Sequence, residues 1–123
     1  MGASRLLIVD DESALLGLLR RYLEKLGYVV ETAGGSQEAL ARFEANPSAF
    51  DLVITDLTLA GLTGEELIAR MRKHNAKLRG IISSGYPHEP QISGVSFLQK
   101  PFLPDMLAEA VEKALRKRPK APY

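Results

Sequence analysis

The stretch LVITD at residues 52–56 decides the fold class of this chain. Four apolar or β-branched residues come directly before Asp56, and a glycine-containing loop follows it. Such a run is typical of a strand that is buried on both faces, as in a parallel sheet covered by helices. The stretch therefore predicts a buried strand that ends in a lone carboxylate.

Three further strand-like runs also end in polar residues. They are residues 6–9, followed by Asp10 and Asp11; residues 80–83, followed by Ser84; and residues 95–98, followed by Gln99 and Lys100. In open α/β sheets, ligands bind at the carboxyl ends of the strands. Three carboxylates, a hydroxyl and an ammonium group at that edge are suited to a divalent cation and a phosphate group.

The composition is that of one ordinary globular domain. The chain has 123 residues, of which 46% are hydrophobic and 25% charged, and its formal net charge is +1. This charge gives no argument for nucleic acid or an anionic membrane, and the lack of cysteine excludes disulfides and thiolate metal sites. No apolar stretch approaches the roughly 20 residues of a membrane-spanning helix, and no signal peptide is visible. We therefore expect a cytoplasmic protein.

Helix-like stretches alternate with the strands. Ser13 is placed to cap a first helix, and the residues expected on its inner face are Leu15, Leu18, Leu19, Tyr22 and Leu26. A second helix is expected to begin at Ser36. Residues 63–66, TGEE, fit a capping box that begins a third, and Pro104 suits the first turn of the last.

One helix is expected to be short or absent. The connection between Ser84 and Val95 contains two prolines and two glycines, which disfavour more than about one helical turn. This fourth helix would otherwise join the fourth and fifth strands. The pattern predicts a doubly wound α/β fold with a five-stranded parallel sheet. We expect residues 1–118 to form the domain and residues 119–123 a flexible tail.

The order of the polar positions resembles a known family. Residues 10–11 (DD), Asp56 with Gly64 after it, residues 84–85 (SG) and residues 100–101 (KP) are similar to the receiver domain of two-component response regulators. The similarity extends over roughly residues 5–115. It implies the flavodoxin-like strand order 2-1-3-4-5. The stretch SGY at residues 84–86 looks like the receivers of hybrid sensor histidine kinases.

The resemblance also implies the chemistry of the site. Asp56 would accept a phosphoryl group from a histidine kinase or a histidine phosphotransfer protein. Magnesium would be held by Asp11, Asp56 and the backbone carbonyl of Thr58, with Asp10 acting through water. Lys100 would pair with the phosphoryl oxygens.

A conformational switch is implied as well. Ser84 would donate a hydrogen bond to the phosphoryl group, and Phe97 on the last strand would move with it. The peptide bond between Lys100 and Pro101 is usually cis in the family, which X-Pro bonds allow. From the residues alone, Ser83 competes with Ser84 for the hydroxyl role, and Phe97 also fits an ordinary core position.

The chain departs from the family pattern at several positions. Ala60 stands where the family often has proline, and Phe97 stands where many members have tyrosine. Thr58 and Tyr86 flank the site, and neither offers an acid or amide to orient an attacking water. We therefore expect self-catalysed phosphorylation and slow dephosphorylation, without turnover of an external substrate. The reduced fourth helix also puts the usual partner-binding face in question.

Two other functions compete with a phosphorylated receiver. One is a receiver-like interaction module that never carries phosphate. The other is a small magnesium-dependent phosphohydrolase with Asp10 as nucleophile and Glu12 as acid. His74 and His88 show no ligand spacing and are expected at the surface. No output domain is visible in these 123 residues, so we expect either a stand-alone receiver or one from a hybrid kinase.

Overall fold

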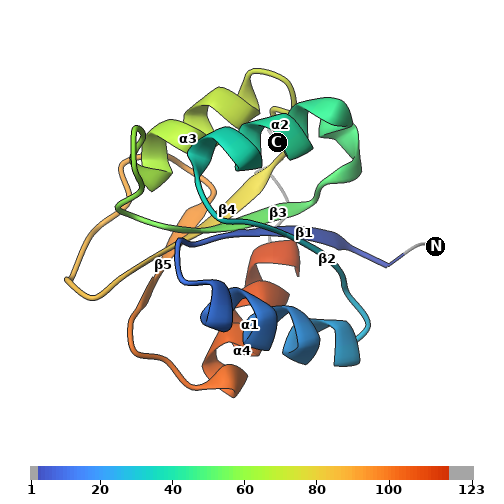
Figure 1. Ribbon diagram of the computed structural model, residues 1–123, viewed down its shortest axis with the longest axis vertical. Coiled ribbons are helices and arrows are strands. Elements are labelled where there is room, and N and C mark those ends of the chain that lie inside the picture. The colour runs from blue at the N-terminus through green and yellow to red at the C-terminus, as the bar shows by residue number, and fades with distance from the viewer. Residues whose placement is uncertain (1–2, 117–123) are drawn as a thin grey trace, which may run out of the picture.

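The computed structural model describes residues 3–116, which contain five strands and four α-helices (Figure 1). All neighbouring strands are parallel, and their order is β2-β1-β3-β4-β5. This confirms the predicted fold class and the strand order implied by the resemblance. The elements are β1 (Arg5–Val9), α1 (Ser13–Lys25), β2 (Val29–Ala33), α2 (Ser36–Ala45), a 3-10 turn (Pro47–Ala49), β3 (Leu52–Asp56), α3 (Gly64–Arg72), β4 (Arg79–Ser84), β5 (Val95–Gln99) and α4 (Pro104–Arg116).

Helices cover both faces of the sheet, with α1 and α4 on one side and α2 and α3 on the other (Figure 1). Successive residues of a strand point to opposite faces, so each buried strand contributes to two cores. In β1, Leu6 and Ile8 pack toward α1 and α4, whereas Leu7 and Val9 pack toward α2 and α3. This double burial explains why the central strands are apolar almost throughout.

No helix forms between β4 and β5 in the described structure, as the glycines and prolines of that connection predict. Gly94, the last residue before β5, has a φ of +72°, a backbone conformation that favours glycine. Also as expected, no described helix is long and apolar enough to cross a membrane. The expected boundary at residue 118 and the tail at residues 119–123 lie outside the described residues.

One prediction for α1 is wrong, and another is confirmed only in part. Ser13 does not cap the helix: Glu12 occupies the N-cap position, and no side chain there makes a capping hydrogen bond. On the predicted inner face, Leu19 is buried and Leu15 and Tyr22 pack against the core. Leu18 and Leu26 are instead 56% and 51% exposed, and the other buried residues of the helix are Leu16 and Leu23. The segment is so rich in leucine that two overlapping stripes fit a 3.6-residue period, and contact with the sheet selects one of them.

The predicted capping box of α3 is confirmed. The Thr63 hydroxyl accepts a hydrogen bond from the Glu66 N–H at 3.1 Å, and the Glu66 carboxylate accepts one from the Thr63 N–H at 2.9 Å. The Gly64 N–H donates to the Leu57 carbonyl at 2.7 Å and closes the loop after Asp56. The start of α3 is therefore fixed close to the end of β3.

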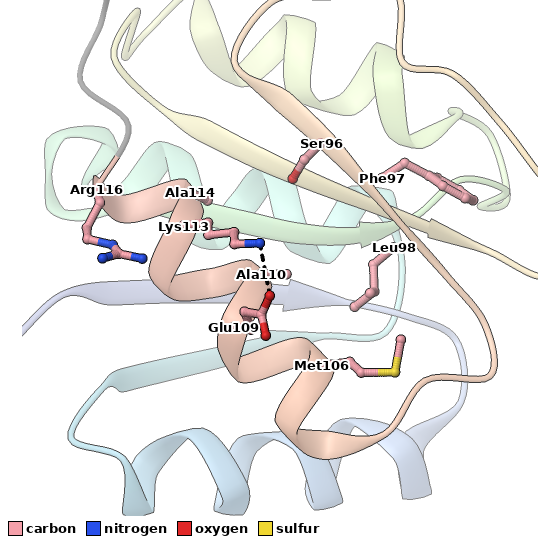
Figure 2. Close-up of a pocket in the computed structure, with 9 residues that line it drawn as sticks. All are labelled: Ser96, Phe97, Leu98, Met106, Glu109, Ala110, Lys113, Ala114 and Arg116. Carbon is pink, nitrogen blue, oxygen red and sulfur yellow. Dashed lines mark ion pairs between the residues drawn. The ribbon is translucent and has the colours of Figure 1, made fainter.

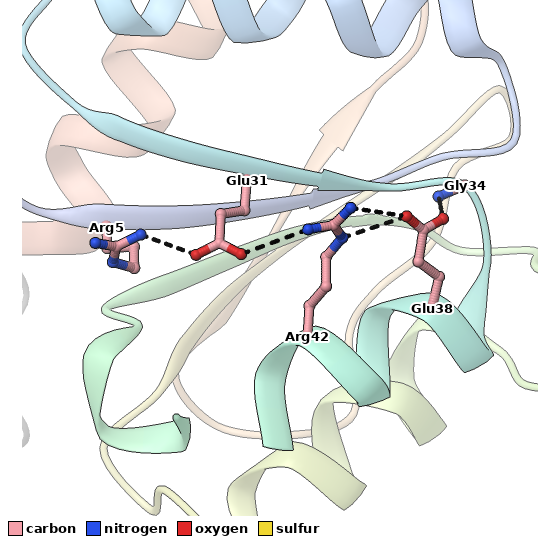
Figure 3. A network of polar contacts seen from close by, with 5 residues as sticks. All are labelled: Arg5, Glu31, Gly34, Glu38 and Arg42. Atoms are coloured by element: carbon pink, nitrogen blue, oxygen red, sulfur yellow. Dashed lines mark hydrogen bonds and ion pairs between the residues drawn. The ribbon is translucent and has the colours of Figure 1, made fainter. Parts of the chain in front are cut away.

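A chain of charged contacts holds β2 against α2 (Figure 3). The Glu31 carboxylate lies 2.8 Å from the Arg5 guanidinium and 3.8 Å from that of Arg42. Arg42 also contacts Glu38 at 3.2 Å, and the Glu38 carboxylate accepts a hydrogen bond from the Gly34 N–H at 2.9 Å. These groups are partly exposed, so each contact contributes little alone. Together they join the edge strand to its neighbouring helix.

Replacing Gly64 by alanine is expected to destabilise the fold by about 1–3 kcal/mol, the usual cost of overpacking. A Cβ atom there would lie 2.6 Å from the Asp56 carbonyl oxygen and 3.1 Å from the Thr55 methyl group. Urea unfolding measures the change. Gly17→Ala is the matched control, since a Cβ in that helical position meets nothing within 4 Å. It should be neutral or stabilising by up to about 1 kcal/mol. Equal stability of the Gly64→Ala protein and wild type would contradict the close approach.

Candidate functional site

Three carboxylates converge at the carboxyl edge of the sheet. Asp10 and Asp11 follow β1, Asp56 ends β3, and β1 and β3 are hydrogen-bonded neighbours. One carboxylate oxygen from each of the three lies within 4.8 Å of the others. Asp10 is buried, Asp56 is half-buried and Asp11 is exposed. This set of hard oxygen donors, open to solvent on one side, fits a divalent cation such as Mg²⁺.

Lys100 brings the one ammonium group that contacts these carboxylates within the described structure. Its Nζ lies 2.7 Å from Asp10 Oδ2 and 3.7 Å from Asp56 Oδ2. The second Asp10 oxygen, Oδ1, accepts a hydrogen bond from the Glu12 N–H at 2.9 Å. Both oxygens of Asp10 are thus engaged. The Lys100–Pro101 peptide bond is cis, as the resemblance implied.

The pKa of Asp56 is raised above its ordinary value of 3.8, chiefly because burial disfavours the charged form. The positive charge of Lys100 opposes the rise, and the negative charge of Asp10 adds to it. The nearby backbone N–H of Leu57 lowers the pKa, while the charge of Asp11 raises it further. Without a cation, ionisation of Asp56 is therefore less favourable than that of an ordinary aspartate, despite the nearby lysine.

The pKa of Lys100 is also raised. Burial is the largest single influence and works to lower it, but the hydrogen bond and charge of Asp10 and the charges of Asp56 and Glu12 together outweigh burial. The ammonium group therefore remains charged beside the carboxylates, as a phosphate-binding lysine requires.

Two serine hydroxyls lie at the end of β4. Both are buried, but their contacts differ. Ser84 Oγ accepts a hydrogen bond from the Tyr86 N–H at 3.0 Å, whereas Ser83 Oγ has no hydrogen-bond partner in the described structure. Ser83 is the register partner of Asp56 on β3. Geometry therefore keeps both serines close to Asp56, and the choice of Ser84 rests on the resemblance.

The remaining predicted residues surround this edge. Thr58 is exposed and forms an isolated antiparallel bridge with Thr63. Tyr86 is 82% exposed, and Phe97 is half-buried. The Phe97 ring meets the edge of the His88 ring at a centroid distance of 6.3 Å.

His88 corrects another expectation. Predicted at the surface, it is half-buried, and its ring contacts Phe97 and the Glu65 carboxylate of α3. Its partners are far away in sequence, so no local spacing could have revealed the contact. His74 is exposed as expected and lies 3.7 Å from Glu44.

A groove of about 560 Å³ lies between β5 and α4, away from the carboxylates (Figure 2). Leu98 points from the strand toward the helix, and Ala110 and Ala114 lie along its wall, with Lys113 and Glu109 paired at 2.9 Å near the rim. The groove holds no cluster of acidic or nucleophilic groups. The chemistry of this domain is therefore concentrated at the carboxyl edge of the sheet.

Sequence comparison agrees with this geometry. The profile of the response regulator receiver domain matches residues 6–112, which is most of the chain and includes every residue described at the carboxyl edge of the sheet. The chain belongs to the response regulator receiver domain family. Receivers of this family act in two-component signalling and bind Mg²⁺ at an acidic cluster, and this receiver has such a cluster.

Curated relatives include regulators and a sensor kinase. The receiver is 31% identical to sensor kinase CckA of Brucella abortus over 95% of this chain and 13% of that protein. It is 29% identical to transcriptional regulatory protein ResD of Bacillus subtilis over 98% of this chain and 51% of ResD. The chain thus spans about half of ResD and a smaller part of CckA.

Solved structures give the same result. The receiver domain of hybrid histidine kinase CckA superposes with a TM-score of 0.83 at 34% identity, covering 92% of this chain and all of the other. TrrA of Thermotoga maritima, solved in complex with Mg²⁺ and BeF, gives a TM-score of 0.79 at 34% identity, covering 91% and 99%. The receiver is therefore similar in structure to one from a hybrid kinase.

Replacing Asp56 by asparagine is expected to stabilise the metal-free receiver at neutral pH. The folded-state pKa of Asp56 is raised, so the folded protein binds this proton more tightly than the unfolded chain does. The stability that Asp56 contributes is present below its ordinary pKa of 3.8 and is lost as pH rises through the folded pKa. Urea unfolding in EDTA should give a higher free energy of unfolding for Asp56→Asn than for wild type at neutral pH. This difference should become smaller as the pH is lowered. If wild type were more stable than Asp56→Asn at neutral pH, the charge of Lys100 would outweigh burial and the neighbouring carboxylates, which contradicts the raised pKa of Asp56.

Proposed function

We propose that this receiver takes a phosphoryl group onto Asp56 from a phosphohistidine donor, in a magnesium-dependent reaction, and thereby changes its affinity for a partner. The observation that carries the proposal is the convergence of three carboxylates with Lys100 at one edge of the sheet. These groups suit phosphoryl transfer, and their fixed positions in the fold support the proposal, because a pre-arranged site needs little reorganisation when a donor arrives.

The transfer exchanges one bond to phosphorus for another. A carboxylate oxygen of Asp56 bonds to the phosphorus atom while the phosphorus–nitrogen bond of the donor histidine breaks, and the electron pair leaves with that nitrogen. Asp11, Asp56 and the Thr58 carbonyl would hold Mg²⁺, with Asp10 acting through water. The bound cation offsets negative charge on the transferred group.

Lys100 and Ser84 have separate tasks in this proposal. The Lys100 ammonium, 3.7 Å from Asp56 Oδ2, neutralises a phosphoryl oxygen by charge. Ser84 donates a hydrogen bond to the phosphoryl group and moves toward it. This movement shifts the β4–β5 connection and Phe97 in the phosphorylated receiver. Half-buried Phe97 is placed to follow that movement.

The geometry favours this function over the phosphohydrolase. Asp10 would be the nucleophile of a hydrolase, but its two oxygens already accept from Lys100 and from the Glu12 N–H. Asp56 has the less occupied carboxylate. Similarity to the CckA receiver supports a histidine kinase or histidine phosphotransfer protein as donor, and supports a hybrid kinase as the parent protein.

Acetyl phosphate and Mg²⁺ should add one phosphoryl group to the wild-type receiver, detected by intact-mass spectrometry. The adduct should be absent without Mg²⁺ and absent in Asp56→Asn. Asp51→Asn is the matched control, since Asp51 lies at the opposite end of β3, where its carboxylate accepts from the Arg5 N–H at 2.8 Å. That variant should be phosphorylated like wild type. An adduct that persists in Asp56→Asn would assign the nucleophile elsewhere, with Asp10 next to test.

We expect the phosphorylated receiver to lose phosphate slowly, over minutes or longer in Mg²⁺. Neither Thr58 nor Tyr86 offers a carboxylate or amide to orient the attacking water, and Tyr86 is 82% exposed. Intact-mass spectra taken after removal of acetyl phosphate give the half-life. Thr58→Asn, which places an amide beside the site, should shorten it severalfold. A wild-type half-life of seconds would contradict this reading of the flanking residues.

A further inference from the structure

The connection between β4 and β5 is held against α3 by two charged side chains. We call residues 85–94, which occupy this connection, the strap. At the start of α3, the Glu65 carboxylate contacts His88 Nε2 with one oxygen and accepts a hydrogen bond from the Gln91 N–H at 3.0 Å with the other. One side chain thus binds two points of the strap.

The other end of the strap is attached by Arg72. Its Nη1 donates to the Ser93 carbonyl at 2.5 Å, and its Nε donates to the Leu78 carbonyl at 2.9 Å. The guanidinium lies so close to the strap that a Cβ atom on Gly94 would be 2.8 Å from Arg72 Nη2. Helix α3 therefore holds the strap at three points, His88, Gln91 and Ser93, which accounts for an ordered connection without a helix.

His88 joins the strap to the predicted switch residues. Its ring contacts Glu65 on one side and meets the edge of Phe97 on the other. The strap also begins directly after Ser84, whose hydroxyl accepts from the Tyr86 N–H. Movement of Ser84 toward Asp56 would pull on residue 86 and, two residues later, on His88.

The contact between Glu65 and His88 is more protected than an ordinary surface pair. The side chains are 18% and 25% exposed, whereas those of the Glu44–His74 pair are 53% and 51% exposed. Partial exclusion of water strengthens a charge-assisted contact and makes its loss more costly. A pair of this kind can favour the arrangement of the strap in which the pair is formed over an arrangement in which it is broken.

We infer that Glu65 and His88 form a latch that holds the strap on α3 in the unphosphorylated receiver and opposes the phosphorylated state. The inference rests on the function proposed above. A contact made only in one state shifts the equilibrium toward that state, so its removal favours the other. Weakening the latch should therefore make a phosphoryl analogue bind more tightly.

Beryllofluoride with Mg²⁺ provides the test, because it mimics a phosphoryl group without turnover. Calorimetric titration of wild type, Glu65→Gln and His88→Gln gives the dissociation constants. We expect each variant to bind about three- to tenfold more tightly, the range that one partly buried pair can supply. Unchanged or weaker binding by both variants would overturn the latch.

The matched controls are Glu44→Gln and His74→Gln, which remove the exposed pair between α2 and the end of α3. They should bind beryllofluoride like wild type. Tighter binding by these controls as well would show a general effect of lost surface charge and would overturn the latch. The double variant Glu65→Gln/His88→Gln should gain no more than the larger single change, because both substitutions break the same contact.

Hydrogen exchange of the unliganded proteins tests the latch independently of phosphorylation. Peptides that cover the strap should exchange faster in Glu65→Gln and His88→Gln than in wild type, while peptides from β1 and β3 should not change. An equal rate in the strap would overturn the latch whatever the titrations give. Wild type that fails to bind beryllofluoride would instead overturn the proposed function, so the two failures are distinguishable.

Discussion

Repulsion among three carboxylates is the constraint on which the site depends. Asp10, Asp11 and Asp56 are held within 4.8 Å of one another because β1 and β3 are parallel neighbours whose ends meet at one edge. Lys100 relieves part of the repulsion, yet the pKa of Asp56 stays raised. The apolar packing on both faces of the sheet supplies the stability that keeps these like charges together. A cation or a phosphoryl group therefore enters a site that is already strained electrostatically.

Under the latch proposal, the strap gives this receiver a different route from the site to the surface. In many receivers the fourth helix contributes to the partner-binding face, but here residues 85–94 carry a set of side-chain contacts to α3 instead. Small rearrangements of such contacts need less reorganisation than the movement of a packed helix. Under the latch proposal, phosphorylation of Asp56 would alter the contacts of α3 as well as the position of β5. The groove between β5 and α4 lies on another side, so the two surfaces need not respond together.

Local sequence signals predicted the parts of the structure that depend on local interactions. The capping box at Thr63, the buried run before Asp56 and the helix-breaking residues between β4 and β5 were all read correctly. The inner face of α1 was predicted only in part, because several leucine stripes satisfy the same period and only contact with the sheet selects Leu16, Leu19 and Leu23. The pairing of Glu65 with His88 was also missed, since it joins residues 23 apart whose approach depends on the whole fold. The candidate site residues were predicted from their order at strand ends together with the family resemblance.

The contact of Gly64 with the Asp56 backbone has a consequence for insertions and deletions. The loop between them is closed by the hydrogen bond from the Gly64 N–H to the Leu57 carbonyl and by the bridge between Thr58 and Thr63. The Ala60 carbonyl also accepts a hydrogen bond from the Ser36 hydroxyl, so an added residue in the loop would disturb the edge that holds Asp56. An added residue inside α3 between Glu65 and Arg72 would act on the strap, because it would rotate one of them by about 100° around the helix. Length variation among close homologues should accordingly be excluded from both the loop and the helix.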